Sequence, residues 1–280
     1  MEYEKSKELS LSALLVRTIL AQEGAARRAL FIKGGAAMLQ HMKVIVTGSG
    51  SGIGKAITLQ CLQEGAAVMA CDINEDALTE LQADANMEKL STYRLDISEY
   101  EDVSSFFAYI SEKHPDVNGL VNNAGIYLGK SLLNYTPDEM AKVMNVNVMG
   151  SVYVSRCFGE MLLQQQRQGT IVNMSSVSGL EGSSDAVYGM SKAAILGLTK
   201  SCAMNFAPFI RVNAVAPTMV DTSMMEEIPV WRKEEYLSHQ LIKQPLRPES
   251  VADTVIFLLS DKSRHYTGAT FDINNGGYLR

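Results

Sequence analysis

The sequence predicts a single α/β domain built on a doubly wound, mostly parallel β-sheet. Short apolar strands alternate with helical segments of roughly 10–20 residues from Lys43 almost to the C-terminus, which is the pattern of consecutive βαβ units. A glycine-dense turn joins the first strand to the first helix, and polar residues follow the ends of later strands. Ligands bind beyond the carboxyl ends of the strands in such sheets, so the pattern also predicts where a site lies.

The predicted elements follow from apolar periodicity and from residues that begin or end helices. Gly65 ends the first helix, Pro115 follows the third, and residues 136–139 (Thr-Pro-Asp-Glu) form a capping box with proline at the first helical position. The predicted strands are 44–47, 66–71, 91–95, 118–121, 170–174, 210–215 and 269–273, and the predicted helices are 52–64, 75–85, 99–113, 136–166, 186–206 and 249–260.

The stretch 43–54 indicates nucleotide binding. An apolar strand runs into four alternating glycines, the last of them Gly54, and a helix follows. Backbone N–H groups and a helix N-terminus then face a phosphate, and glycine is required where a Cβ would block the turn or the pyrophosphate. Asp72 lies 18 residues after Gly54, at the end of the second strand, where an acidic side chain holds an adenosine ribose. Together these features favour a nucleotide site over a flexible loop.

Further polar and small residues follow the carboxyl ends of the predicted strands. Because those ends meet at one edge of a parallel sheet, we expect the residues after them to form one site. They are the glycine turn, Asp72, Asp96, residues 122–125 (Asn-Asn-Ala-Gly), Ser175, Ser176 and Pro217.

Composition excludes several classes of protein. The chain has 280 residues, 46% of them hydrophobic and 20% charged, as expected for one large globular domain. Its net charge of −6 argues against a nucleic-acid or anionic-membrane partner, and no run approaches the ~18 apolar residues of a membrane span. The four cysteines have no paired spacing and the four histidines are scattered, so we expect no metal, no disulfide and a reducing, cytoplasmic location.

Residues 1–41 do not continue the alternation of strands and helices. The segment 9–20 is apolar but interrupted by Arg17, and it lacks the basic start and unbroken apolar run of a signal peptide. Two interpretations stay open: a native amphipathic helix, or a leader added ahead of a natural start at Met42, which we favour slightly. The predicted division is an N-terminal extension, 1–41, and a nucleotide-binding catalytic domain, 42–280.

Tyr188 and Lys192 lie four residues apart on a predicted helix, and therefore on one face of it. Lowering a phenol pKa of ~10 by ~3 units needs about 4 kcal/mol, which one unit charge supplies at ~4 Å and an effective dielectric of ~20. Lys192 is thus expected to activate Tyr188 as an acid/base catalyst. Most isolated pairs of this spacing are surface residues on a helix, so the pair alone is weak evidence.

Two more polar residues strengthen the pair. Ser176 ends a strand 12 residues before Tyr188, where its hydroxyl would hydrogen-bond a substrate carbonyl; a cap or loop hydrogen bond is the alternative. Asn147 lies inside a predicted helix, where asparagine is unfavourable and a buried amide needs a partner. A water relay and a helix kink both explain it, and Asn145 is a second candidate for the same role.

These motifs, taken together, resemble the short-chain dehydrogenase/reductase family. The matching residues are Thr47, Gly48, Gly52, Ile53 and Gly54 of the glycine turn, then Asn122–Gly125, Asn147, Ser176, Tyr188 and Lys192, in the family's order and approximate spacing over 43–278. The joint set is specific although each part alone is not. The resemblance implies a Rossmann fold and hydride transfer between a nicotinamide and a substrate carbon.

The resemblance also implies a role for each matching residue. Tyr188 would transfer a proton to or from the substrate oxygen and Ser176 would orient that oxygen. Lys192 would hold the nicotinamide ribose and lower the tyrosine pKa, and Asn147 would anchor a water on the proton path. The implied cofactor contacts are Gly48, Ser51, Gly52, Ile53, Gly54, Asp72, Ile73, Asp96, Ile97, Asn123, Ala124, Gly125, Tyr188, Lys192, Pro217 and Thr222.

Three departures from the family pattern are visible. The gap between Ser176 and Tyr188 is one residue shorter than is common, so Ser175 remains an alternative for the serine. Thr218 follows Pro217 where the family usually has glycine, and residues 275–277 read Asn-Gly-Gly in place of Asp-Gly-Gly. None of these changes removes a catalytic group.

The sequence thus favours an NAD-linked dehydrogenase acting on a secondary alcohol or ketone, of hydroxysteroid, cyclic alcohol, polyol or 3-oxoacyl type. The alternatives are an isomerase or epimerase of the same family and a non-catalytic nucleotide-binding scaffold. Asp72 predicts a preference for NAD over NADP. Segments 127–135, 178–187 and 218–245 are expected to set the substrate, the last of them as an apolar lid or as a helix pair packed on the core. The resemblance implies a homotetramer, or else a homodimer.

Overall fold

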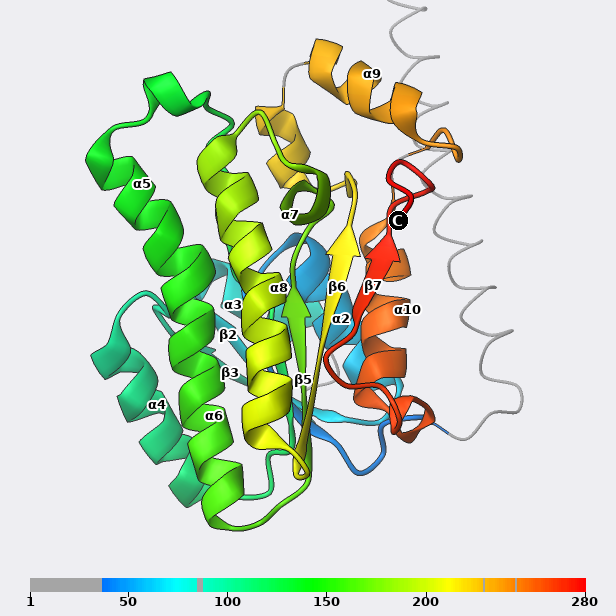
Figure 1. The fold of residues 1–280 in the computed structure, drawn as a ribbon. Coiled ribbons are helices and arrows are strands. Elements are labelled where there is room, and N and C mark those ends of the chain that lie inside the picture. The colour runs from blue at the N-terminus through cyan, green and yellow to red at the C-terminus, as the bar shows by residue number, and fades with distance from the viewer. Residues whose placement is uncertain (1–36, 85–87, 229, 245) are drawn as a thin grey trace, which may run out of the picture. The chain divides into compact units, whose positions relative to one another are not determined.

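A computed structural model describes residues 37–84, 88–228, 230–244 and 246–280. Within them, Met38–Arg280 forms one compact unit in which helices cover both faces of a central β-sheet (Figure 1). Residues 1–36, most of the predicted N-terminal extension, lie outside the described residues. The boundary proposed at Met42 therefore stays a prediction.

Seven strands form the sheet in the described residues, and every neighbouring pair is parallel. The order across the sheet is β3-β2-β1-β4-β5-β6-β7, so the chain moves outward in one direction from β1 and then in the other from β4. The predicted doubly wound sheet is confirmed. The strands are β1 (Lys43–Thr47), β2 (Ala67–Asp72), β3 (Leu90–Arg94), β4 (Gly119–Asn122), β5 (Gly169–Met174), β6 (Ile210–Pro217) and β7 (Thr270–Ile273).

Side-chain alternation along the strands divides the core between the two faces of the sheet. Val44 and Val46 of β1 point into one apolar cluster, whereas Ile45 between them points into the other, as the pleat requires. Both faces of a parallel sheet are covered, which is why β1 reads as an unbroken apolar run instead of an alternating one.

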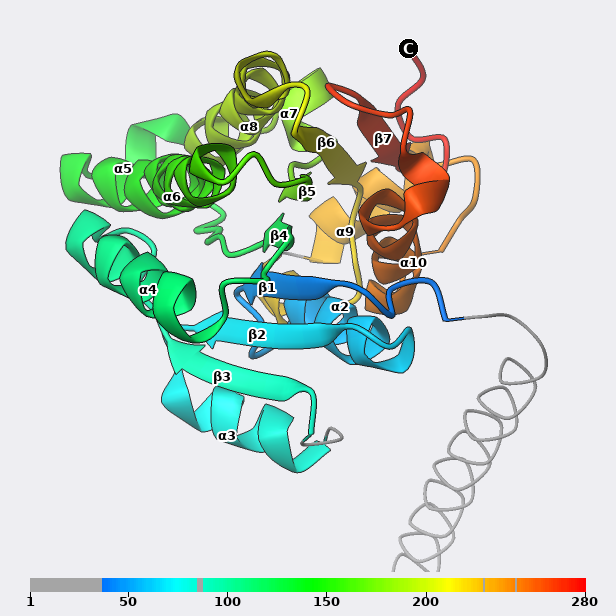
Figure 2. The same cartoon turned by 90° about the horizontal axis from the view of Figure 1, so that it is seen from below.

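Amphipathic helices close each face. The first cluster receives residues of α2 (Gly52–Gln63), α3 (Glu75–Asp84) and α10 (Pro248–Leu259), and the second receives residues of α4 (Tyr100–Lys113), α6 (Ser151–Gln164) and α8 (Ala186–Phe206). Figure 2 shows α2 and α10 on one side of the sheet and α4, α6 and α8 on the other. α5 (Pro137–Met144) lies beside α8. This layered arrangement leaves the carboxyl ends of the strands at one edge of the unit.

The predicted helix 136–166 is interrupted. Its start is as expected: the Thr136 hydroxyl accepts from the Glu139 N–H at 3.3 Å, and the Glu139 carboxylate accepts from the Thr136 N–H at 3.0 Å. A π-helical turn, Asn145–Gly150, then separates α5 from α6. Of the two explanations for an asparagine at position 147, the helix irregularity is therefore present.

Two segments near the strand ends contain helical structure beyond the helices that the sequence predicted. A short helix, α7 (Ser178–Glu181), follows β5. Within 218–245 the chain forms a 3₁₀ turn, Ser223–Glu227, and the helix α9 (Val230–His239). In Figure 1, α7 and α9 lie beyond the carboxyl ends of β5 to β7.

The compact unit begins slightly before the predicted boundary. Leu39 is completely buried, and its N–H donates to the Glu64 carbonyl at 3.0 Å, while the Met38 N–H donates to the Glu64 carboxylate at 2.9 Å. Residues 38–41 thus pack against the end of α2 and contribute to the first apolar cluster.

Candidate functional site

A cavity of about 820 Å³ lies at the carboxyl ends of the strands, within the size range of cofactor and ligand sites. It collects nearly all the residues that the sequence placed there. They are Gly48, Ser51, Gly52, Ile53, Asp72, Ile73, Asp96, Ile97, Asn123, Ala124, Gly125, Ser176, Tyr188, Lys192, Pro217 and Thr222. Gly54 and Asn147 do not line the cavity, but each contacts residues that do.

The glycine turn leaves no room for a side chain at two positions, one of which faces the end of β4 and the other the turn itself. Gly48 has φ +65°, and a Cβ there would lie 2.7 Å from the Ala124 Cα. A Cβ on Gly54 would lie 1.9 Å from the Gly48 carbonyl oxygen. The chain therefore folds back sharply and starts α2 with its N-terminal N–H groups toward the cavity, the arrangement that binds a phosphate.

Asn123 fastens this turn to β4. Its Nδ2 donates to the carbonyl oxygens of Thr47 and Gly48, both at 3.0 Å. In return, the Thr47 hydroxyl accepts the N–H groups of Asn123 at 3.1 Å and of Ala124 at 3.2 Å. Asn123 thus has a structural duty in addition to the cofactor contact that the sequence assigned to it.

Asp72 stands next to the glycine turn. Its Oδ2 accepts from the Gly50 N–H at 2.9 Å and its Oδ1 from the Asn74 N–H at 3.0 Å. An ionised carboxylate has about four lone-pair sites, so these two bonds orient the group while leaving acceptor capacity toward the cavity. The side chain is placed to accept the hydroxyl groups of a ribose. The glycine cradle and this carboxylate together fit a dinucleotide.

Asp96 is held differently. Its Oδ1 accepts from both the N–H and the hydroxyl of Ser98, at 2.9 and 2.6 Å, so the side chain also stabilises its own turn after β3. Asp96 and its neighbour Ile97 line the same end of the cavity as Asp72.

Tyr188 and Lys192 lie on α8 at the opposite end of the cavity. Lys192 is 5% exposed, its Nζ donates to the Met174 carbonyl at 3.0 Å, and it lies 5.7 Å from the centre of the Tyr188 ring. Burial without a carboxylate partner lowers the pKa of Lys192 to about 8. Its charge is thus set by desolvation, and the carbonyl fixes its position.

Burial is also the largest influence on the pKa of the Tyr188 phenol. It raises the pKa of Tyr188 to about 12; a hydrogen bond with Ser176 lowers the pKa, while the phenols of Tyr127 and Tyr236 and the carboxylate of Asp185 raise it. From sequence, Lys192 was expected to lower this pKa by about three units. The structure gives the opposite net shift because both partners are desolvated and the ammonium points to a backbone carbonyl.

The two serines after β5 have different surroundings. Ser175 donates its hydroxyl to the Lys192 carbonyl at 2.7 Å, which ties the strand to α8. Ser176 hydrogen-bonds to Tyr188, and its hydroxyl also accepts from the Ser178 N–H at 3.2 Å. Of the two candidates, Ser176 is thus the serine that meets the phenol.

Asn147 connects three elements from within the π-helical turn. Its Oδ1 accepts from the Ile126 N–H at 2.8 Å, and its Nδ2 donates to the Ile126 carbonyl and the Ser191 hydroxyl, both at 3.0 Å. The Ser191 hydroxyl in turn donates to the Tyr188 carbonyl at 2.7 Å. The amide therefore supports the β4 loop and α8 together, and its role in a proton relay stays a prediction.

The cavity also has apolar and aromatic lining residues. They include Tyr127, Val177, Met219, Met224, Met225, Ile228 and Tyr236. The Tyr127 and Tyr188 rings meet edge to face with centroids 5.0 Å apart. The sequence marked segments 127–135 and 218–245 as specificity regions but did not single out Tyr127, because an aromatic residue in a loop carries no periodic signal.

A second group missed from sequence is Asp185, the N-cap of α8. It is completely buried and accepts the Tyr188 N–H at 3.0 Å. An aspartate three residues before a helical tyrosine is a recognisable cap signal and could have been found.

Residues 37–84, 88–228, 230–244 and 246–280 contain no group of three or more acidic, histidine or cysteine side chains placed to hold a metal ion. The four cysteines are free and buried. No helix in these same ranges is long and apolar enough to cross a membrane.

Known proteins resemble this chain in sequence and in fold. Residues 48–278 match the family described as Enoyl-(Acyl carrier protein) reductase. A 3-oxoacyl-(acyl-carrier-protein) reductase of Thermotoga maritima is 37% identical over 242 residues, 85% of this chain and 98% of that protein. A 3beta-hydroxysteroid dehydrogenase of Mediterraneibacter gnavus is 34% identical over 262 residues, 84% and 94% of the two chains. A short-chain dehydrogenase/reductase (glucose/ribitol dehydrogenase) structure from Brucella melitensis superposes with a TM-score of 0.81 at 26% identity, covering 88% of this chain and 100% of that one.

The buried Lys192 makes stability depend on pH. Its pKa is about 8 in the folded protein against 10.5 for an ordinary lysine, so between these values the unfolded chain binds the extra proton and the free energy of unfolding rises with pH. Relative to Lys192→Met, we expect the wild type to gain up to about 1.4 kcal/mol per pH unit over that window. Urea unfolding of both proteins from pH 7 to pH 10.5 measures the difference, and a difference independent of pH contradicts the expectation.

Proposed function

The chain is an oxidoreductase of the short-chain dehydrogenase/reductase family, which acts on CH–OH or keto groups, and we propose that it interconverts a secondary alcohol and a ketone with NAD(H). The observation that carries the proposal is the convergence of Ser176, Tyr188 and Lys192 at one end of a cavity whose other end is a glycine cradle beside Asp72. A dinucleotide lying between these ends would bring its nicotinamide to the phenol.

Each residue has a defined task in this reaction. The bound nicotinamide supplies or accepts the hydride at the substrate carbon. Tyr188 gives its phenolic proton to the substrate oxygen in reduction and takes it back in oxidation, while the Ser176 hydroxyl holds that oxygen. Lys192 would bind a ribose hydroxyl of the cofactor, with its ammonium held beside the Tyr188 ring by the Met174 carbonyl. With a pKa of about 12, the phenol is protonated at neutral pH, which favours its role as an acid in carbonyl reduction.

The substrate that fits best is a largely uncharged, apolar alcohol or ketone. Three methionines and Ile228 are among the residues that line the cavity, and methionine side chains adapt to irregular apolar ligands. Relatives acting on 3-oxoacyl groups and on a 3β-hydroxysteroid support the same class. A screen of steroid, cyclic alcohol, polyol and 3-oxoacyl substrates at the reduced-nicotinamide absorbance band tests the proposal; no turnover with any of them argues against it.

NAD is the proposed cofactor because of Asp72. A 2′-phosphate would bring about −1.5 to −2 charges against its carboxylate, and unit charges at ~4 Å repel by about 1 kcal/mol in water and about 4 kcal/mol at an effective dielectric of 20. The following residue, Ile73, is 54% exposed and offers no cation to a phosphate. The glycine turn likewise contributes Ser51 and no arginine.

We expect Tyr188→Phe to lower kcat by about 10²–10⁴-fold, since only the hydroxyl that transfers the proton is removed. NADH affinity, followed by fluorescence titration, should stay within a few-fold of wild type. Met190→Leu, an exposed change on the same helix, is the matched control. Turnover by Tyr188→Phe within a few-fold of wild type would exclude the phenol as acid/base.

We expect the wild type to prefer NAD over NADP by at least roughly tenfold in kcat/KM, because each 1.4 kcal/mol of repulsion is about a factor of ten. Asp72→Ala should reduce that preference chiefly by improving the use of NADP. Steady-state kinetics with both cofactors for the two proteins measures the change. Equal use of NAD and NADP by the wild type, or no relative gain for NADP in the variant, shows that Asp72 is not the selector.

A homotetramer, or else a homodimer, in the cytoplasm completes the proposal. The family resemblance supports the assembly, and four free, buried cysteines suit a reducing compartment. Light scattering at micromolar concentration should give twice or four times the chain mass of 30.6 kDa, and a monomer would contradict the assembly.

A further inference from the structure

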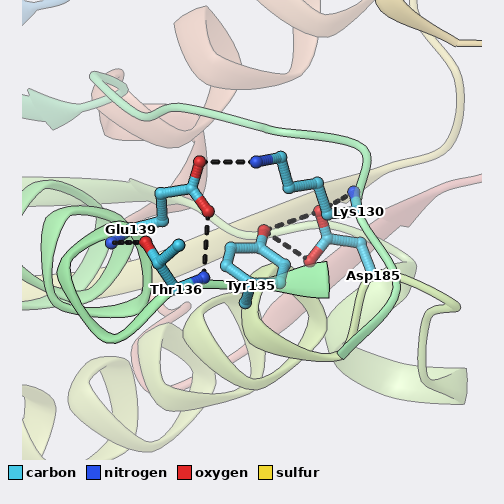
Figure 3. Close-up of polar contacts among 5 residues, drawn as sticks. All are labelled: Lys130, Tyr135, Thr136, Glu139 and Asp185. Carbon is cyan, nitrogen blue, oxygen red and sulfur yellow. Dashed lines mark hydrogen bonds and ion pairs between the residues drawn. The ribbon is translucent and has the colours of Figure 1, made fainter. Parts of the chain in front are cut away.

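Asp185 is a completely buried carboxylate outside the predicted set of site residues, and it contacts three parts of the chain. Its Oδ1 accepts from the Tyr188 N–H at 3.0 Å, and its Oδ2 accepts from the Lys130 N–H at 3.3 Å. The Tyr135 hydroxyl donates to the carboxylate, 2.8 and 2.9 Å from its two oxygens (Figure 3). A buried charge is costly unless it is hydrogen-bonded, so three donors at one carboxylate form a built cluster.

The donors come from the two sides of the reacting phenol. Tyr188 lies on the first turn of α8, which Asp185 caps. Lys130 and Tyr135 belong to the loop between β4 and α5, and the same loop carries Tyr127, whose ring packs edge to face on Tyr188. The carboxylate therefore fixes the distance between the catalytic helix and the loop that walls the substrate side.

The β4–α5 loop is also fixed by contacts with the start of α5. The Lys130 ammonium pairs with the Glu139 carboxylate, whose other oxygen accepts the Thr136 N–H at 3.0 Å at the start of α5 (Figure 3). Tyr135 is buried against Val143 and Val187, one from α5 and one from α8. The loop is thus fastened at both ends, and Asp185 is the attachment to the catalytic helix.

We propose that Asp185 is a positioning residue for the hydride-transfer reaction, holding Tyr188 and Tyr127 at their working separation by binding α8 and the β4–α5 loop at one carboxylate. The inference rests on the proposed function of Tyr188. It assigns the group that orients the acid/base residue and explains why an acidic side chain, and not merely a helix cap, stands at position 185.

An asparagine at position 185 would differ from the aspartate in its hydrogen-bonding groups. Asparagine would keep one oxygen for the Tyr188 N–H and would still cap α8. Its NH₂ group would face the Lys130 N–H, and a donor cannot accept from a donor. Asp185→Asn should therefore leave the helix capped and the Tyr135 hydroxyl bound to the remaining oxygen, but break the Lys130 contact of the loop, while Tyr135→Phe removes one donor and leaves both backbone contacts in place.

The negative charge of Asp185 also bears on the phenol. The groups that face Tyr188 are Lys192 on the same helix, Ser176 after β5, Tyr127 of the loop, Tyr236 of α9 and Asp185 itself. Burial is the largest cause of the raised pKa of both Tyr188 and Tyr135; Asp185 raises the pKa of each further, and Tyr127 and Glu139 also raise that of Tyr135. Removing the charge should lower the pKa of Tyr188, so the limb of the kcat/KM profile governed by this phenol should move to lower pH in Asp185→Asn.

The experiment compares wild type, Asp185→Asn, Tyr135→Phe and, as a matched control on α4, the exposed Asp102→Asn. For Asp185→Asn we expect kcat to fall by about 10- to 100-fold through misplacement of the phenol, with the dissociation constant of NADH changed less than about twofold. Tyr135→Phe should lose several-fold in kcat without moving the pH limb. Asp102→Asn should match the wild type in every measurement.

Amide hydrogen exchange gives a readout that needs no turnover. In Asp185→Asn the Lys130 amide should exchange faster while the Tyr188 amide stays protected, and in Tyr135→Phe both should stay protected. Unchanged kcat and pH limb in Asp185→Asn, or equal loss of protection at both amides together with lost NADH binding, overturns the proposal. If Asp185→Asn does not fold, Tyr135→Phe decides, because wild-type kcat in that variant also overturns it.

Failure of the proposed function gives different results from failure of the Asp185 proposal. If the wild type turns over no alcohol or ketone, or if Tyr188→Phe is fully active, the catalytic assignment fails. The exchange pattern at Lys130 and Tyr188 would still report whether the carboxylate holds loop and helix together.

Discussion

The close approach of the glycine turn to the end of β4 is the contact on which the rest of the site depends. A Cβ on Gly48 would lie 2.7 Å from the Ala124 Cα, and Asn123, the residue after β4, donates to the Gly48 carbonyl at 3.0 Å. The contact is possible only where the strand order reverses, between β1 and β4, because there the loops leave the sheet in opposite directions. The turn at the start of α2 takes its position from this contact, and the Asp72 carboxylate is tied to the same turn through the Gly50 N–H.

The other half of the site depends on buried polar groups. Lys192 and Asp185 lie on or next to α8 with 5% and 0% exposure, and neither forms an ion pair among the contacts of the described residues. Each is satisfied instead by other hydrogen bonds: Lys192 by the Met174 carbonyl, and Asp185 by two backbone N–H groups and a phenol. Hydrogen bonds fix direction as well as distance, so both buried groups have defined positions beside Tyr188. The desolvation of both groups is a stability cost that function explains better than folding does.

Sequence was sufficient for the fold and for most of the cavity lining. Apolar runs, glycine punctuation and strand-end polar residues are local signals, and the parallel sheet brings them together without further information. The π-helical turn could not be predicted, because only the tertiary contacts of Asn147 with Ile126 and Ser191 show how its amide is satisfied. The upward pKa shift of Tyr188 was missed for a related reason. A four-residue spacing gives the direction of a lysine along a helix but not the extent to which both partners are desolvated, nor the carbonyl to which the ammonium turns.

Helix α8 brings the buried polar groups together: Asp185 caps it, and Tyr188 and Lys192 lie on it. Along a helix, residues three and four apart lie on one face, so Asp185, Tyr188 and Lys192 form a row in which the cap, the acid and the cation follow each other. The row is stiff because its first member is attached to the β4–α5 loop and its last to β5. Within it the phenol has the higher pKa, about 12, and the lysine the lower, about 8, so at neutral pH the phenol is protonated and the lysine largely charged. A proton leaving the phenol would then leave its negative charge beside a cation that cannot move away, and that fixed arrangement lowers the reorganisation needed during transfer.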